Sequence, residues 1–299
     1  MGSFVRLSGT MAAVALAGAA FAAPSAAQAQ AMGGDPPTFT VPCSTTALVT
    51  AINAANSFGS ANIRLRPRCN YKITTPATGT DGLPIITGHI NLVGGFGTVI
   101  KRNSATNFRI LEVAAAATLH VTSVSILDGN TAGLGGGILN AGTLTLNAVI
   151  LSGNTAGNGG GLSNSASATA TITSSHFTAN STTGVGGGGI INFGLLKVTG
   201  STFSGNTAPI NGGGLNTQAS GTSRLFWTSF TGNTSGSLGG GISNLGTTSL
   251  RGGTIRFNKG SSGGGIATSN TNVTLRRTVV RNNIPNNCNP INTIKGCHN

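Results

Sequence analysis

The sequence predicts an all-β protein, a right-handed parallel β-helix with three strands in each coil and a short N-terminal capping helix. Three observations predict it: a recurring apolar-x-x-Asn signal, a glycine run before an aliphatic residue in each repeat, and an alternating segment between them. The composition agrees, because 48 glycines among 299 residues and 7% charged side chains are unlike an ordinary mixed α/β enzyme. The 38% hydrophobic content recurs at regular intervals, which disordered chains lack.

The first signal places an apolar residue three positions before an asparagine. The asparagines follow one another at intervals of 24, 26, 26, 27, 25 and 25 residues. The pairs are Leu127 with Asn130, Leu151 with Asn154, Phe177 with Asn180, Phe203 with Asn206, Phe230 with Asn233, Ile255 with Asn258, and Val280 with Asn283. Because coils stack about 4.8 Å apart, we expect the apolar members to stack inside the solenoid. The asparagines should form an amide ladder at a turn and tolerate left-handed backbone there.

The second and third signals complete each repeat. A glycine triplet precedes an aliphatic residue in each of the six intervals, ending at Ile138, Leu162, Ile190, Leu215, Ile242 and Ile266. Between these markers run alternating segments such as Leu144–Leu146 and Leu196–Val198. Alternation with β-branched residues predicts strands, so each repeat holds about three short strands separated by turns. Three strands per turn are typical of a β-solenoid.

The combination of these signals resembles a known family. Phe203-Ser204-Gly205-Asn206 and Phe230-Thr231-Gly232-Asn233, paired with GGGI or GGGL, are similar to the repeats of polymorphic outer membrane proteins and related bacterial right-handed β-helix proteins. The resemblance covers residues 121 to 283. It implies the β-helix fold, and adhesins are among the proteins that carry such repeats.

Residues 1–31 have the pattern of a secretory signal peptide. Arg6 is followed by an apolar run from Met11 to Ala23 and then by small residues with A-x-A sites ending at Ala29 and Ala31. A membrane anchor is the alternative, but the run is shorter than the roughly 20 residues that span a bilayer. We therefore expect export, with no membrane span after removal of the signal. The periplasm, the cell surface and the medium all remain open as destinations.

The four cysteines lie near the two ends of the expected mature chain. Their even number and grouping predict two local disulfides, Cys43 with Cys69 and Cys288 with Cys297. A zinc site is the competing interpretation, but neither pair has CxxC spacing. Residues 32–70 are then an N-terminal cap, 71–120 irregular first coils, 121–283 regular repeats and 284–299 a C-terminal cap.

The N-terminal cap contains the predicted helix. Over residues 45–57 the spacing of Leu48, Ile52 and Ala55 places them on one face, and Ser44 or Thr45 is the candidate N-cap. A cap is required because an open solenoid end exposes unpaired strand edges.

Candidate catalytic groups are few. The acidic residues are Asp35, Asp81, Glu112 and Asp128, and none follows Asp128. The regular repeats therefore cannot supply the carboxylate pair of a glycosidase or a carboxylate-rich calcium site. The histidines are scattered and no G-x-S-x-G elbow is present. We expect no catalysis, cofactor or metal site; the alternative is a polysaccharide lyase or glycoside hydrolase of the β-helix type acting near Asp81, Glu112 and Asp128, which clustering of the three would favour.

Charge is the feature with the clearest functional meaning. Residues 129–299 contain nine lysines and arginines and no acid. Counted back from the apolar marker, four of these basic residues lie at even offsets and two lie one residue beyond it, so all six should point outward. They are Lys197 and Arg224 at minus six, Arg251 and Arg276 at minus four, and Arg256 and Arg281 after the marker.

This outer basic face suggests a partner. An acidic polysaccharide or another cell-surface polyanion would be attracted to such a row, and salt should weaken the contact. The alternative is a solvated face that keeps a low-charge solenoid soluble. Nucleic acid is a less favoured partner, because the aromatic residues are expected in the core. The first hypothesis is a secreted structural or binding protein, adhesin-like, without an active site; its oligomeric state is not predicted.

Overall fold

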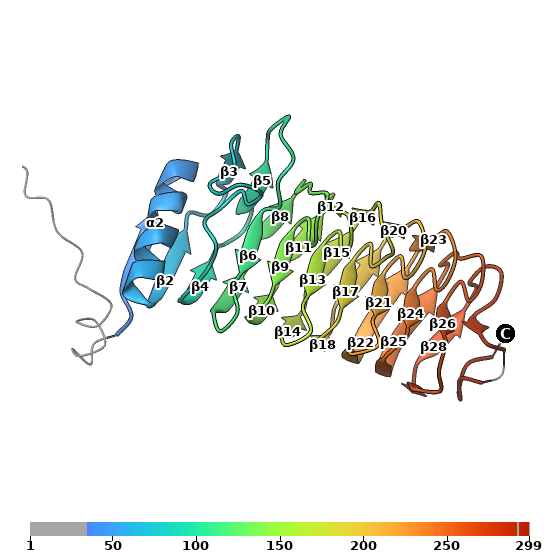
Figure 1. Ribbon diagram of the computed structural model, residues 1–299. Helices are drawn as coiled ribbons and strands as arrows, with labels where there is room; N and C mark the ends of the chain where they lie inside the picture. The colour runs from blue at the N-terminus through green and yellow to red at the C-terminus, as the bar shows by residue number, and fades with distance from the viewer. Residues whose placement is uncertain (1–34, 292, 299) are drawn as a thin grey trace, which may run out of the picture.

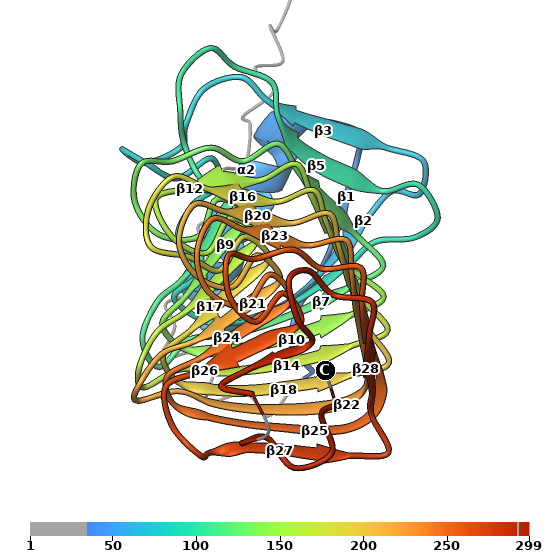
Figure 2. The same cartoon turned by 90° about the vertical axis from the view of Figure 1, so that its right-hand side faces the viewer.

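The computed structural model describes residues 35–291 and 293–298. Its strands wind through about ten coils into a β-solenoid, with one helix at the N-terminal end (Figure 1). Strands of neighbouring coils pair in parallel, and the view along the axis shows each coil as a loop with a sheet on each side (Figure 2). The predicted fold class is confirmed.

The largest sheet has 17 strands in two rows that meet at a bend. The first row consists of β1 (Thr38–Val41), β2 (Ser60–Leu65), β4 (His89–Val93), β7 (Thr118–Thr122), β10 (Thr143–Asn147), β14 (Thr169–Thr173), β18 (Leu195–Thr199), the first parts of β22 (Thr222–Thr231) and β25 (Thr247–Arg256), and β27 (Val273–Arg276). The second consists of β3 (Asn70–Ile73), β5 (Val99–Arg102), β8 (Ser125–Leu127), β11 (Ile150–Ser152), β15 (His176–Thr178), β19 (Thr202–Ser204), the last parts of β22 and β25, and β28 (Val279–Arg281).

Two smaller sheets close the coils. The eight-stranded sheet follows the glycine triplets and consists of β6 (Leu111–Val113), β9 (Ile138–Asn140), β13 (Leu162–Asn164), β17 (Ile190–Asn192), β21 (Leu215–Thr217), β24 (Ile242–Asn244), β26 (Ile266–Thr268) and β29 (Cys288–Asn289). The four-stranded sheet, which the sequence pattern does not predict, consists of β12 (Thr155–Ala156), β16 (Ser181–Thr182), β20 (Thr207–Ala208) and β23 (Thr234–Ser235).

The interior is filled by residues that stack on their counterparts. The ring centroids of Phe177 and Phe203 are 4.8 Å apart, and those of Phe203 and Phe230 are 4.6 Å apart, both pairs nearly parallel. Leu151 pairs with Phe177 on one side of this stack and Ile255 with Phe230 on the other. All five side chains are buried, as expected.

The asparagine ladder is confirmed from Asn154 to Asn283. Each amide nitrogen donates to the Oδ1 of the next asparagine at 2.9 to 3.0 Å, and each Oδ1 also accepts the backbone N–H of the asparagine before it. The amide nitrogen of Asn206 also donates to the carbonyl of Phe177, and the others repeat this contact. A buried amide is stable here because its partners are supplied by its own column.

Two details of the predicted ladder are wrong. In the first regular coil, Leu151 pairs with Ile126 rather than with Leu127, so Gly129 rather than Asn130 lies in register with Asn154. Left-handed backbone occurs one residue before the ladder position, as at Gly205 and Phe257, and not at the asparagines. The asparagines are selected for their hydrogen bonds and not for their backbone conformation.

A second amide column follows the glycine triplets and was not predicted. Asn140 donates to Asn164, and Asn164 to Asn192, both at 2.8 Å and fully buried. Later coils replace the amide with threonine at Thr217 and Thr268. The signal in the sequence is an asparagine two residues after the aliphatic residue of four of the six glycine markers.

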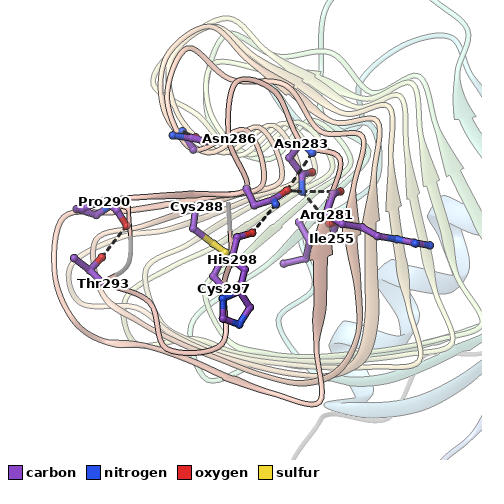
Figure 3. Close-up of a disulfide and its surroundings, with 11 residues drawn as sticks. Ile255, Arg281, Asn283, Asn286, Cys288, Pro290, Thr293, Cys297 and His298 are labelled. Atoms are coloured by element: carbon purple, nitrogen blue, oxygen red, sulfur yellow. Dashed lines mark hydrogen bonds between the residues drawn. A yellow bond between two sulfur atoms is a disulfide. The ribbon is translucent and has the colours of Figure 1, made fainter.

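Both ends are closed as the sequence indicates. The helix α2 (Thr45–Phe58) begins at Ser44, whose side chain accepts the N–H of Ala47, and it buries Leu48, Ile52 and Ala55. Disulfides join Cys43 to Cys69 and Cys288 to Cys297, with Cα separations of 5.5 and 6.4 Å. Figure 3 shows the C-terminal disulfide beside the last ladder residue, Asn283, whose backbone and side chain donate to Asn287.

The first coils differ in part from expectation. The sequence of these coils predicts strands at residues 83–86, 89–93, 98–101 and 110–113. The last three are present as β4, β5 and β6, but residues 83–86 form no strand. Leu83 and Ile86 are nevertheless buried, and Ile86 forms a single bridge to Val113. The signal peptide predicted at 1–31 lies outside the described residues.

Candidate functional site

The six predicted basic residues are all exposed on the 17-stranded sheet. In the first row Lys197 lies on β18, Arg224 on β22, Arg251 on β25 and Arg276 on β27. In the second row, Arg256 and Arg281 end β25 and β28 and stack on each other. Figure 3 shows the Arg281 side chain directed away from the coil.

The four first-row cations form two columns and not one continuous row. Lys197 pairs with Arg224, but the partner of Arg224 in the next coil is Ser249. Arg251 pairs with Arg276, two residues further along the strands. The expectation that all four line one outer face holds, because positions two residues apart on a strand face the same side. The arrangement is a staggered patch across four coils.

No acidic side chain of this chain neutralises the patch. The three ion pairs among the described residues join Lys101 to Asp128, and Arg109 to Asp81 and Glu112. Every one lies before residue 129, after which the sequence has no acid. Among the described residues, the exposed cations of the later coils thus have no carboxylate partner.

The bend between the two rows places one residue of each coil in left-handed conformation. This set, which we call the corner column, has φ between 49° and 74° and consists of Ser123, Ala148, Ser174, Gly200, Trp227, Gly252 and Arg277. Most of its members are small. Trp227 and Arg277 are the exceptions, and Trp227 is the one tryptophan of the chain.

The Trp227 ring lies on the backbone of the next coil. A Cβ added to Gly252 would be 2.4 Å from Cε3 and 2.7 Å from Cζ3, so only glycine leaves room for the indole there. Trp227 is nevertheless 63% exposed, and the adjacent Phe226 is 38% exposed. The expectation that the aromatic residues lie in the core is wrong for this pair, because Phe226 shares the outward parity of Arg224.

Two other exposed aromatic rings each have a cation over one face. Arg68 lies over Phe96 at 5.9 Å from the ring centroid, and Arg256 lies over Phe257 at 5.6 Å. Among the described residues no guanidinium lies over Trp227 in this way. Its exposed ring is therefore free to contact another molecule.

The acidic residues are divided between two places. Asp81 is 4% exposed and lies 3.2 Å from Arg109, which is itself 7% exposed and also binds Glu112. Burial raises the pKa of Asp81 to about 6; Arg109 opposes this and Glu112 adds to it. Asp128, directly after β8, instead lies 3.6 Å from Lys101 on the neighbouring strand β5. The three predicted acids do not form one cluster.

A groove at the N-terminal end has no charged lining. It has a volume of about 660 Å³ and lies between β1 and the start of α2, bordered by Phe39, Val41, Ala47 and their neighbours. Across residues 35–291 and 293–298, no three metal-binding side chains come together, and no helix is long and apolar enough to cross a membrane.

No protein family, curated protein or solved structure matches this chain.

Proposed function

We propose that this protein is a secreted, adhesin-like binding protein that contacts an acidic polysaccharide or another cell-surface polyanion through its basic face. The observation that carries the proposal is the patch of six exposed cations in a part of the chain that has no acid. The resemblance of the repeats to those of polymorphic outer membrane proteins favours a role at a cell surface.

The physical basis of the proposal is the positive electrostatic potential of cations that no acidic side chain neutralises. Cations separated by one or two coils lie within about 10 Å of each other, roughly one Debye length at 0.1 M salt, so their potentials add. A flexible polyanion can contact several of them together and release its counterions. The binding free energy should therefore weaken steeply with ionic strength.

Export is part of the proposal. Disulfides are typical of proteins that mature in an oxidising compartment, and this solenoid has one at each end. A polyanion of the cell surface or the surrounding matrix is available there.

The placement of the three acids does not favour a lyase or a hydrolase. Asp81 and Glu112 share Arg109, Asp81 is buried, and Asp128 is paired with Lys101. A lyase or hydrolase acting through these three acids would need them to meet at an open surface.

The test is a binding panel. Residues 32–299 are presented with acidic glycans and other polyanions at low and high salt, beside a variant with Arg224, Arg251 and Arg276 changed to serine. A matched control changes Arg64, Arg66 and Lys72, three exposed cations of the first coils, to serine. We expect salt-sensitive binding that the first variant loses by at least about tenfold and the control keeps.

The control distinguishes binding by the basic face from attraction by net charge alone. Equal losses in both variants would show that net charge alone attracts the ligand. Absence of binding by the unmodified protein would overturn the proposal and leave the basic residues with a role in solubility.

A further inference from the structure

We infer that Phe226 and Trp227 form a stacking platform for a sugar ring, which makes the basic face selective for an acidic polysaccharide over polyanions without rings. This inference rests on the proposed function and names the ligand class of the same surface. Three features of the two residues carry it: backbone conformation, ring environment and neighbouring charge.

The backbone of Trp227 is in a conformation that bulky residues rarely adopt. Its φ is 51°, while the corner column has serine, alanine or glycine in the four coils before it and glycine in the coil after it. Left-handed backbone at a large residue costs free energy, and such outliers concentrate at functional sites. Packing does not require a tryptophan here, because the smaller residues make the same bend.

The ring environment is that of a platform. On the C-terminal side the indole lies flat on Gly252, where any side chain would displace it. On the N-terminal side the column offers Gly200, around which an added Cβ would meet only Ser174 Oγ at 3.9 Å. One face of the ring is thus supported and the rest is open, as its exposure of 63% shows. A pyranose ring can place its apolar C–H face on such a surface.

The surrounding cations give the platform its preference for acids. Arg251 occupies the position of Phe226 in the next coil, Arg276 follows one coil later, and Arg277 occupies the position of Trp227 two coils on. Arg224 lies two residues before Phe226 on the same face. A sugar ring on the indole would therefore hold its carboxylate or sulfate beside guanidinium groups, which bind such oxyanions in bidentate geometry.

Single-stranded nucleic acid also combines stacking with charge. It is bound by several aromatic residues in succession, one for each base. Here one exposed indole and one half-exposed phenyl ring are adjacent in the chain; the other exposed rings are Phe96, in the first coils, and Phe257, and each already has its own arginine over one face. The arrangement favours a chain in which a ring contact at one point is combined with charge along its length.

The chain contains its own reporter, because Trp227 is its one tryptophan. Tryptophan emission and its quenching by acrylamide are recorded while polygalacturonate, inorganic polyphosphate or a single-stranded DNA oligonucleotide is added to the full mature chain. We expect polygalacturonate to shift the emission and protect the indole from the quencher, and polyphosphate to bind without protecting it.

Two variants complete the test by measuring affinity directly. Glycine in Trp227→Gly suits the left-handed backbone. Phe96→Ala removes an exposed ring that already has Arg68 over one face. We expect Trp227→Gly to lose about tenfold or more in affinity for polygalacturonate and to keep its affinity for polyphosphate. Phe96→Ala should change neither affinity.

The outcomes separate the two proposals. Unchanged affinity of Trp227→Gly for polygalacturonate would overturn the platform while the polyanion-binding function stands. Absence of binding to all three probes would overturn both. Stronger protection of the indole by the oligonucleotide than by polygalacturonate would assign the surface to nucleic acid.

Discussion

The first coils and the later coils provide partners for their buried polar side chains in different ways. Before residue 129, the buried cation Arg109 is matched by acids, Asp81 and Glu112, while cations such as Arg64 and Lys72 lie outside. After it, the buried polar groups are neutral amides in columns, and the cations lie outside with no acid to match them.

The difference shows what frees a surface for binding. Ion pairs satisfy the buried charge of the first coils. The amide ladder needs no charge, so the lysines and arginines of the later coils play no part in the core and remain available to a partner. The predictions below test that division of roles.

The ladder should be the most sensitive part of the later coils. Asn206→Ala would remove the acceptor of the Asn180 backbone N–H and of one Asn180 amide hydrogen, together with the donor to Asn233 Oδ1 and to the carbonyl of Phe177, all in a buried column. We expect a loss of about 4 kcal/mol in the free energy of unfolding, measured by urea denaturation. Asn130→Ala, which lies outside the ladder register, should cost less than about 1 kcal/mol. Similar losses at the two positions would show that the ladder has no special weight.

The disulfides should contribute unequally at the two ends. The Cys43–Cys69 bond closes a longer loop than Cys288–Cys297, with separations of 26 and 9 residues. Loop-entropy arguments give about 3.5 kcal/mol for the first and about 2.5 kcal/mol for the second. Paired Cys→Ser variants in thermal denaturation should therefore place the N-terminal variant lower in Tm. The reverse order would mean that the C-terminal cap limits stability.

Acid should stabilise the first coils through Asp81. Its pKa is raised to about 6 in the native state from an ordinary value of 3.8, so the native state binds this proton more tightly than the unfolded chain does. The free energy of unfolding should then rise by up to about 3 kcal/mol as the pH falls from above 6 to below about 4, and this gain is lost as the pH rises through 6. Urea denaturation across this range should show a weaker pH dependence for Asp81→Asn. An identical dependence would exclude Asp81 as its source.

Trp227→Gly should have the smallest effect on folding. Glycine relieves the left-handed backbone, while the unfolded chain gains entropy and a partly exposed contact with Gly252 is lost. We expect a free energy of unfolding that is unchanged or higher by up to about 1 kcal/mol, measured by urea denaturation. A large loss would mean that the indole is needed to shape the bend, and its role would be structural.

Much of the fold could be predicted because stacking makes each coil repeat the last. The spacing of Asn154, Asn180 and Asn206 determines the coil length, and the phenylalanine stack follows from it. The predicted register is wrong by one residue at Leu127. The neighbouring Ile126 is equally apolar, so the periodic pattern alone cannot choose between them. The two-residue strands such as β12 escaped prediction because they are too short to show alternation.

The candidate site was predicted less completely. Parity along the strand correctly placed Arg224 and Arg251 outside, but their columns depend on strand pairing, which the sequence leaves open. The same parity rule applied to Phe226 would have exposed it. Trp227 could not have been placed, because it lies where the strand turns a corner and the alternation breaks.

The ladder has a direction, and that direction makes the coil a unit of growth. Each asparagine donates one amide hydrogen to the asparagine of the coil that follows, and its Oδ1 accepts one from the coil before, with 26 residues from Asn180 to Asn206. A duplicated stretch of that length would find the same donors above it and the same acceptors below it, while both caps stay as they are. Gene duplication could lengthen such a molecule one coil at a time, and with each added turn carry further copies of its outer face along the rod.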